Sequence, residues 1–221
     1  MKNIINELNK INRRGYSFSN VFSDWLDLML YSLLALTKHR LDGKTGMNIQ
    51  NKYNDEYLKI INKYSNTEKK GEREADFFAK AYAEFLIALV NEKDKDILGD
   101  IYMEYVSSGH NGQFFTPVHI SDMMAEIAGD IKDDSRVLDP TCGSGVMLIS
   151  ASKVNKKAKL TGIDLDQRCA KMAVLNLCYR NLSGVIGWGN SLTGEMFMEW
   201  RMEKGFIIQI DNPKKWEIKV A

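Results

Sequence analysis

Apolar residues in the first half of the chain recur every three or four positions, which is the spacing of one helix face. The run from Phe18 to Leu36 has this pattern, and shorter runs follow at Phe78–Leu89 and Leu98–Val106. The intervening stretch Gly43–Gly71 is polar. No row of polar catalytic groups accompanies these faces, so the pattern favours helices that pack together. We therefore expect an all-helical N-terminal domain over residues 1–107.

The pattern changes after Ser107. A turn cluster is followed by Thr116 and Pro117, a pair typical of a helix start, with threonine as the N-cap and proline at the first helical position. The helix is expected to run to about Gly129. Its apolar residues are expected to point inward, and they are Ile120, Met123, Met124 and Ile127.

Beyond Asp134, short apolar strands alternate with helices, and such alternation predicts parallel βαβ units with right-handed crossovers. The predicted fold class is α/β, with an incomplete domain over residues 108–221. The expected strands are Arg136–Asp139, Leu160–Leu165, Gly184–Gly187 and Phe206–Ile210. The expected helices are Val146–Val154, Gln167–Leu182 and Met196–Glu203.

Composition narrows the class of protein. The 221 residues carry a net charge of +1, which argues against a protein that holds nucleic acid by bulk charge alone. The cysteines Cys142, Cys169 and Cys178 are odd in number and have no metal-ligand spacing, so we expect free thiols, a cytoplasmic location and no metal site. We expect no secretory leader and no membrane span, because the longest apolar run, Trp25–Leu36, is too short.

The segment from Asp139 to Leu148 carries the candidate chemistry. A strand ends at Asp139, glycines follow at Gly143 and Gly145, and a helix begins. Glycines let the backbone approach a ligand closely, and the helix start offers unpaired N–H groups. This position, the carboxyl end of the first parallel strand, is where open α/β sheets bind nucleotides.

Three classes of cofactor bind at such a loop. A phosphate-binding Walker loop needs lysine followed by serine or threonine, but Val146 and Met147 stand there. A dinucleotide loop needs a third small residue, but Leu148 stands there. S-adenosylmethionine (SAM) is cationic at its sulfonium and amino groups, which suits Asp139. Asp164, at the end of the second strand, is placed to accept ribose hydroxyls. The residues favour SAM.

These residues resemble the SAM-binding motif of amino-group DNA methyltransferases, most closely the modification subunits of type I restriction-modification systems. Gly112–Pro117 is similar to the extra cofactor motif of that subgroup, Gly162–Asp166 to its ribose-binding segment, and Gly189–Leu192 to its adenine-contacting segment. The resemblance implies that SAM is held by Gln113, Phe114, Phe115, Thr116, Pro117, Asp139, Thr141, Gly143, Ser144, Gly145, Asp164, Leu165, Asn190, Ser191 and Leu192.

The catalytic motif of that family is Asn or Asp, two prolines and an aromatic, after the fourth strand. Here Asn212 and Pro213 match it, whereas Lys214 and Lys215 replace the second proline and the aromatic, and Trp216 comes one residue late. The resemblance implies Asn212 and Pro213 as the catalytic residues of a degenerate motif. Against the seven strands of the family, the four expected strands indicate a sheet truncated after the fourth.

The resemblance implies a SAM-dependent methyltransferase that acts on adenine N6 of DNA. DNA binding would require a specificity subunit or another partner chain, and self-association is left open. One alternative is a remnant that binds SAM or a protein without catalysis. Another is an enzyme that methylates RNA or a protein glutamine.

Overall fold

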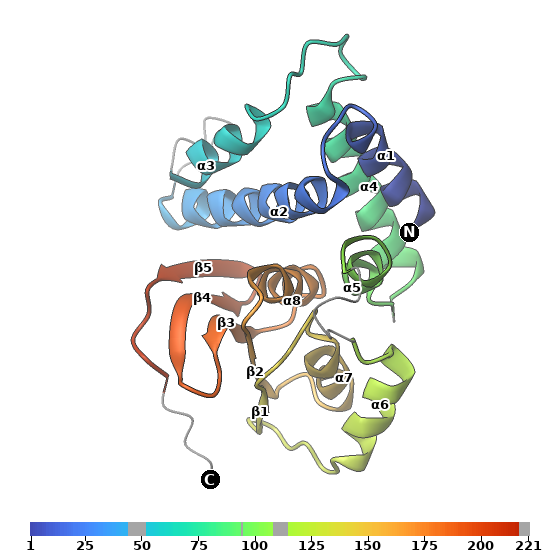
Figure 1. Cartoon of the computed structure of the whole chain (residues 1–221). Coiled ribbons are helices and arrows are strands. Elements are labelled where there is room, and N and C mark those ends of the chain that lie inside the picture. The colour runs from blue at the N-terminus through green and yellow to red at the C-terminus, as the bar shows by residue number, and fades with distance from the viewer. Residues whose placement is uncertain (44–51, 94, 108–114, 217–221) are drawn as a thin grey trace. The chain divides into compact units, whose positions relative to one another are not determined.

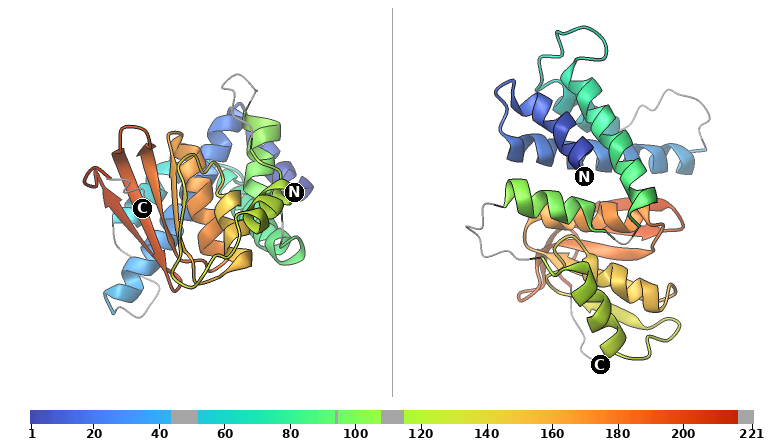
Figure 2. Two further views of the ribbon diagram at one scale, coloured as in Figure 1. Left: turned by 90° about the horizontal axis from the view of Figure 1, so that it is seen from below. Right: turned by 90° about the vertical axis from the view of Figure 1, so that its right-hand side faces the viewer.

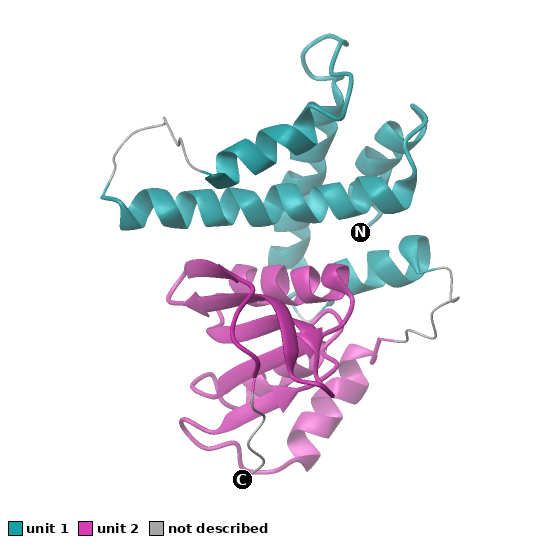
Figure 3. Ribbon diagram, turned by 60° about the vertical axis from the view of Figure 1, so that its left-hand side comes forward, with its two compact units in different colours: residues 1–114 teal, residues 115–221 magenta. Residues whose placement is uncertain are grey.

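The computed structural model describes residues 1–43, 52–93, 95–107 and 115–216, which form two compact units (Figures 1 and 3). Unit 1 covers Met1–Phe114 and unit 2 covers Phe115–Ala221. The division therefore falls seven residues after the expected boundary at 107.

Unit 1 is helical, as the spacing of its apolar residues predicts. Its helices are α1 (Lys2–Asn12), α2 (Phe18–Leu41), α3 (Lys52–Ile61), α4 (Glu74–Asn91) and α5 (Ile97–Ile101), followed by the π-helical turn η1 (Tyr102–Val106). The core forms around Trp25, whose ring meets Phe85 edge-on at 5.9 Å. None of the described helices is both long enough and apolar enough to cross a membrane.

Two helices of unit 1 were not predicted. Helix α1 buries Ile4, Ile5, Leu8 and Ile11, and its other residues are polar. Helix α3 lies in the stretch that looks polar overall, and of its residues only Ile60 is buried. Both helices are stabilised by packing of a narrow apolar face on their neighbours rather than by a broad apolar pattern.

Unit 2 contains helices on a mixed sheet with strand order β1-β2-β3-β4-β5. The first three strands are parallel, and β4 and β5 are each antiparallel to the preceding strand. The elements are α6 (Val118–Ile127), β1 (Arg136–Asp139), α7 (Val146–Val154), β2 (Lys159–Asp164), α8 (Gln167–Tyr179), β3 (Gly184–Asn190), β4 (Glu195–Glu203) and β5 (Phe206–Asp211).

Helices α7 and α8 lie on the same face of the sheet (Figure 2), as two successive right-handed crossovers require. Glycines allow this close packing. A Cβ atom on Gly162 would lie 2.9 Å from Leu148 of α7, and one on Gly184 would lie 3.2 Å from Leu177 of α8. The opposite face of the sheet leaves Leu138 and Ile208 exposed.

The prediction for the last third of unit 2 was wrong in two respects. Met196–Glu203 is not a helix but strand β4, and Phe206–Ile210 belongs to a strand that is antiparallel to its neighbour. A tight turn at Lys204 and Gly205, both with positive φ, joins the two strands as a hairpin. The sheet therefore has five described strands rather than four, and only three of them form the expected parallel arrangement.

The orientation predicted for α6 was also wrong. Met123, Met124 and Ile127 are exposed, whereas Ser121 and Ala125 are buried. The buried residues are small because this face fits against α7: the Ser121 hydroxyl lies 3.1 Å from the Met147 sulfur. The helix begins one residue later than expected, with Pro117 rather than Thr116 as its N-cap.

Candidate functional site

The loop between β1 and α7 is folded against the end of β2. The backbone N–H of Cys142 donates to the carbonyl of Ile163 at 2.8 Å, and Gly145 donates to Cys142 at 2.7 Å. Gly143 and Gly145 both have positive φ, which glycine adopts without strain. The loop is thus a compact turn whose shape requires these two glycines.

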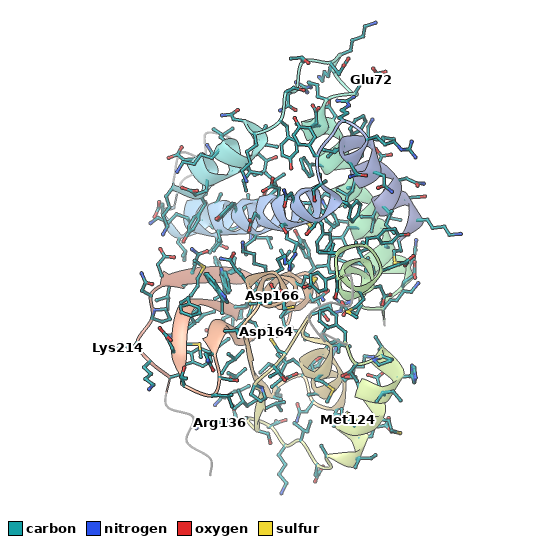
Figure 4. The ribbon with its side chains drawn as sticks, viewed as in Figure 1. Glu72, Met124, Arg136, Asp164, Asp166 and Lys214 are labelled. Atoms are coloured by element: carbon teal, nitrogen blue, oxygen red, sulfur yellow. The ribbon has the colours of Figure 1, made fainter. Side chains whose placement is uncertain are left out.

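Asp164 joins this loop to the second strand. Its Oδ2 accepts the backbone N–H of Gly143, and its Oδ1 accepts the N–H of Asp166, both at 2.8 Å. The carboxylate is therefore fixed in one orientation at the carboxyl end of β2. Figure 4 shows Asp164 and Asp166 close together in this part of unit 2.

Asp139 supplies a second acid at the end of the neighbouring strand. One of its oxygens accepts the N–H of Thr141 at 3.1 Å. Burial raises the pKa of both Asp139 and Asp164, while the backbone N–H bonds to each oppose that shift. Two partly buried carboxylates at adjacent strand ends create a negative site whose charge an incoming cation would stabilise.

An aromatic side chain covers the glycine loop. A Cβ atom built on Gly143 would lie 3.1 Å from the Phe115 ring, so the ring sits directly against the backbone there. Thr116 and Pro117 follow and lead into α6. Gln113 and Phe114, also expected to hold the cofactor, lie outside the described residues.

Helix α8 holds the far side of the loop. A Cβ atom on Gly145 would lie 3.1 Å from Ala173, and the buried amide of Asn176 donates to the Ser144 carbonyl at 2.9 Å. Sequence reasoning missed Asn176. The sequence indicates its role only in that a polar residue stands among the apolar residues that α8 buries.

The end of β3 forms the third side of the site. The side-chain oxygen of Asn190 accepts the N–H groups of Leu192 and Thr193, at 3.0 and 3.3 Å. A carbonyl oxygen has two lone pairs, so the group that Asn190 can offer to a ligand is its amide donor. Ser191 lies in the turn, and Leu192 is 95% exposed.

Trp188 is a second residue that sequence reasoning missed. It is directly opposite Asp164 in the β2–β3 pairing, and its indole N–H donates to the carbonyl of Leu165 at 3.1 Å. Its ring also lies 5.1 Å from that of Phe197. The sequence does show an aromatic residue two positions before Asn190 on the same strand, and this spacing could have indicated that Trp188 lies near the site.

Asn212 and Pro213 do not lie beside the glycine loop. They follow β5, which is four strand spacings, or about 19 Å, from β1. The N–H of Asn212 donates to Phe197, and Trp216 donates from its ring to buried Glu199 at 2.7 Å. This segment packs on the sheet face opposite α7 and α8, and Lys214 lies at the outer side of unit 2 (Figure 4).

Parts of this chain are similar to known methyltransferases. The type II restriction enzyme and methyltransferase RM.BcgI of Heyndrickxia coagulans is 36% identical over 116 residues, which are 44% of this chain and 18% of that protein. The type I restriction enzyme MjaVIII methylase subunit of Methanocaldococcus jannaschii is 33% identical over 142 residues, 59% of this chain and 23% of that one. The chain thus matches about a fifth of the length of these relatives.

Among solved structures, a modification subunit of a putative type I restriction enzyme from Vibrio vulnificus is 15% identical with a TM-score of 0.47, covering 86% of this chain and 55% of that one. The model of the family described as N-6 DNA Methylase matches residues 93–219, more than half of the chain. This matched region contains the glycine loop, both acids and Asn190. The chain belongs to the N-6 DNA methylase family.

Proposed function

We propose that unit 2 binds SAM at the carboxyl ends of β1, β2 and β3. The observation that carries the proposal is the bond between the Asp164 carboxylate and the Gly143 N–H, which joins the acid of one strand to the glycine turn of the next. When bound, SAM supplies an electrophilic methyl group. The residues present fit SAM, because the partly buried carboxylates of Asp139 and Asp164 favour its cationic groups.

Roles for the individual residues follow from their positions in this site. Asp164 would accept the ribose hydroxyls, with the lone pairs that its two backbone bonds leave available. Asn190 would donate its amide to a ring nitrogen of adenine. Phe115 would cover the methionine end. The contributing residues of the loop are Asp139, Thr141, Gly143, Ser144 and Gly145; Thr116, Pro117, Leu165, Ser191 and Leu192 complete the proposed site, together with Gln113 and Phe114.

We further propose that the reaction is methyl transfer to adenine N6 in DNA, in the manner of a type I modification subunit. Membership of the N-6 DNA methylase family supports this substrate. The curated relatives include a type I methylase subunit, which supports an assembly with a specificity subunit or another partner chain. With a net charge of +1, much of the contact with DNA would come from that partner. A cytoplasmic location agrees with three free cysteines.

Methyl transfer also needs a group that orients the adenine amine, and the positions of Asn212 and Pro213 do not suit them to this role. They follow β5, the strand farthest from β1 in the sheet, and their backbone belongs to the turn that places Trp216. We propose that the adenine amine is held by residues other than these two. A SAM-binding unit without its own catalytic motif is the second candidate, and the observation behind it is that Lys214 and Lys215 replace the second proline and the aromatic of the motif.

Two measurements test these proposals separately. Isothermal titration calorimetry of the full chain with SAM tests the binding site, and absence of heat would contradict it. Incubation with tritium-methyl SAM and unmethylated plasmid DNA, followed by nucleoside analysis, tests catalysis. Labelled N6-methyladenine supports the enzyme, whereas binding without label supports the second candidate.

A further inference from the structure

The peptide group between Leu165 and Asp166 is held at both ends. Its N–H, on Asp166, donates to Oδ1 of Asp164 at 2.8 Å, and its carbonyl, on Leu165, accepts the indole N–H of Trp188 at 3.1 Å. A peptide group is planar, so a bond at one end fixes the direction in which the other end points. Trp188 therefore determines where the N–H that Asp164 accepts is aimed.

The Asp164 carboxylate takes its orientation from two backbone donors. Asp166 donates to one of its oxygens and Gly143 to the other, both at 2.8 Å. With both donors fixed, the remaining lone pairs of the carboxylate point in set directions, and a binding site depends on such support from the residues behind it. These lone pairs are the ones that would accept the ribose hydroxyls of SAM. Trp188 thus stands one peptide group away from the acid that would hold the ligand.

The indole ring of Trp188 is itself fixed by the neighbouring strands. In the parallel pairing of β2 with β3, Trp188 lies directly opposite Asp164. In the antiparallel pairing of β3 with β4, the register shifts between Trp188 and Gly189, which makes Phe197 an extra residue in β4. The Phe197 ring lies 5.1 Å from the Trp188 ring, tilted by 60°. A bulge that re-aims a side chain is a common feature beside active sites.

We propose that Trp188 is a positioning residue for the cofactor: through the Leu165–Asp166 peptide group, its indole N–H sets the orientation of the Asp164 carboxylate that binds the ribose of SAM. The inference rests on the proposed SAM site and adds to it a residue that acts without touching the ribose hydroxyls. It also gives β4 a role at the cofactor edge, because Phe197 packs on the ring that makes the bond.

A double-mutant cycle, measured by calorimetry of the full chain with SAM, tests the link to Asp164. Phenylalanine keeps an aromatic ring but has no N–H. We expect Trp188→Phe to weaken SAM binding about tenfold, the effect of one lost hydrogen bond. In the Asp164→Ala background the same substitution should weaken binding by less than about twofold, because the carboxylate that Trp188 orients is gone. Equal effects in the two backgrounds would overturn the proposal.

Trp200→Phe is the matched control. It also removes an indole N–H bond, the 3.0 Å bond to Gln209, and Trp200 pairs with Ile186, two residues before Trp188 on β3. Trp200 is fully buried whereas Trp188 is half-buried, so a general loss of stability would make Trp200→Phe the more harmful variant. We expect the opposite order for SAM affinity, which should be unchanged in Trp200→Phe. A larger loss of affinity in the control than in Trp188→Phe would contradict the assigned role.

The pH profile of SAM affinity provides a readout that altered stability would not move. Burial raises the pKa of Asp164, as do the charges of Asp166 and Asp139, and the backbone bonds from Asp166 and Gly143 oppose the rise. Release of the peptide group in Trp188→Phe should weaken one opposing bond and raise the pKa further. Affinity should then begin to fall at a higher pH than in the wild type or the control variant. An unshifted profile would overturn the proposal.

Amide hydrogen exchange tests the same link without ligand. The Asp166 amide should exchange faster in Trp188→Phe than in Trp200→Phe, because its alignment with the carboxylate is lost. If Trp188→Phe fails to fold, the wild type still decides the question: its Trp188 indole resonance should be protected from exchange and should shift when SAM is added. Absence of SAM binding by the wild type would overturn the proposed function together with this inference. SAM binding with equal Asp166 exchange in the two variants, or with an unprotected and unshifted indole resonance, would overturn this inference alone.

Discussion

The Asp164 carboxylate accepts the Gly143 backbone N–H at 2.8 Å, so the acid that ends one strand determines where the glycine turn of the neighbouring strand lies. The same carboxylate also accepts the N–H of Asp166, at the start of α8. One side chain thus links two loops of the candidate site. Substitution of Asp164 should affect both the charge of the site and the position of the loop.

Asp164→Asn should weaken SAM binding by roughly 10- to 100-fold, the effect of losing a charge-assisted hydrogen bond. The substitution keeps the size of the side chain and one acceptor oxygen. Calorimetry with SAM measures the change. Asp130→Asn, an exposed acid ahead of β1, is the control and should bind SAM like the wild type. Equal affinities for the two variants would remove Asp164 from the site.

Gly145→Ala should destabilise unit 2 by about 2–4 kcal/mol, combining positive φ with a clash against α8. The new Cβ would lie 3.1 Å from the Cβ of Ala173. Gly129→Ala isolates the backbone contribution, because Gly129 has a similar φ of 88° and no neighbour within 4 Å. Its cost should be about 1 kcal/mol. Urea unfolding of both variants gives the difference, and equal costs would contradict the close approach of α8.

Trp216→Phe should cost about 1–3 kcal/mol, because it leaves the buried Glu199 carboxylate without the indole N–H that it accepts. Thermal unfolding measures this change. The variant keeps the backbone N–H of residue 216 that donates to the Gly194 carbonyl, so the turn that carries Asn190 should stay in place and SAM affinity should be unaltered.

Asn212→Ala tests the same segment at the candidate catalytic residue. It removes the only asparagine of the degenerate motif and should not change SAM affinity measured by calorimetry. Any residual methylation of plasmid DNA should persist. Loss of methylation with unchanged SAM binding would restore Asn212 as a catalytic residue, against the geometry described above.

The pH dependence of SAM binding should reflect the raised pKa values of Asp139 and Asp164. A cation is held by their ionised forms, so affinity should fall as the pH is lowered through these values, beginning above the ordinary carboxyl range. Stability should respond in the opposite direction. The folded state holds these two protons more tightly than the unfolded state does, so protonation removes a cost of burial.

Calorimetry and urea unfolding from pH 7 to pH 4, on the wild type and on Asp139→Asn/Asp164→Asn, separate these two effects. Affinity of the double variant should be low and nearly independent of pH. Its stability advantage over the wild type should be largest near pH 7 and should shrink towards pH 4. An advantage that grows as the pH falls would contradict the raised pKa values.

Local sequence determines some elements of this fold fully. The predicted limits of β1 and α7 agree with the observed ones, Arg136–Asp139 and Val146–Val154. A strand, a turn with two glycines at positive φ, and an apolar helix follow one another directly, so neighbours along the chain specify each boundary. The acids at the two strand ends could be assigned to one site for the same reason, because parallel strands bring their carboxyl ends to one edge.

Other elements depend on partners far away in the sequence. The side chains of β4 resemble a helix pattern, and its pairing is fixed by the two-residue turn at Lys204–Gly205 and by β3. The exposed methionines of α6 follow from the fit of Ser121 against α7. Asn176 contacts a residue 32 positions earlier in the chain. No periodicity along one segment contains such information.

The strand order also has a kinetic consequence. Strands β3, β4 and β5 are consecutive in the chain and pair through short turns, so closing them costs little loop entropy. Pairing β1 with β2 requires closure of a helical crossover instead. We therefore expect the three-stranded meander to form first in folding, which would show as early amide protection. The cofactor edge would be assembled last, and its loops would be the first to open in the native protein.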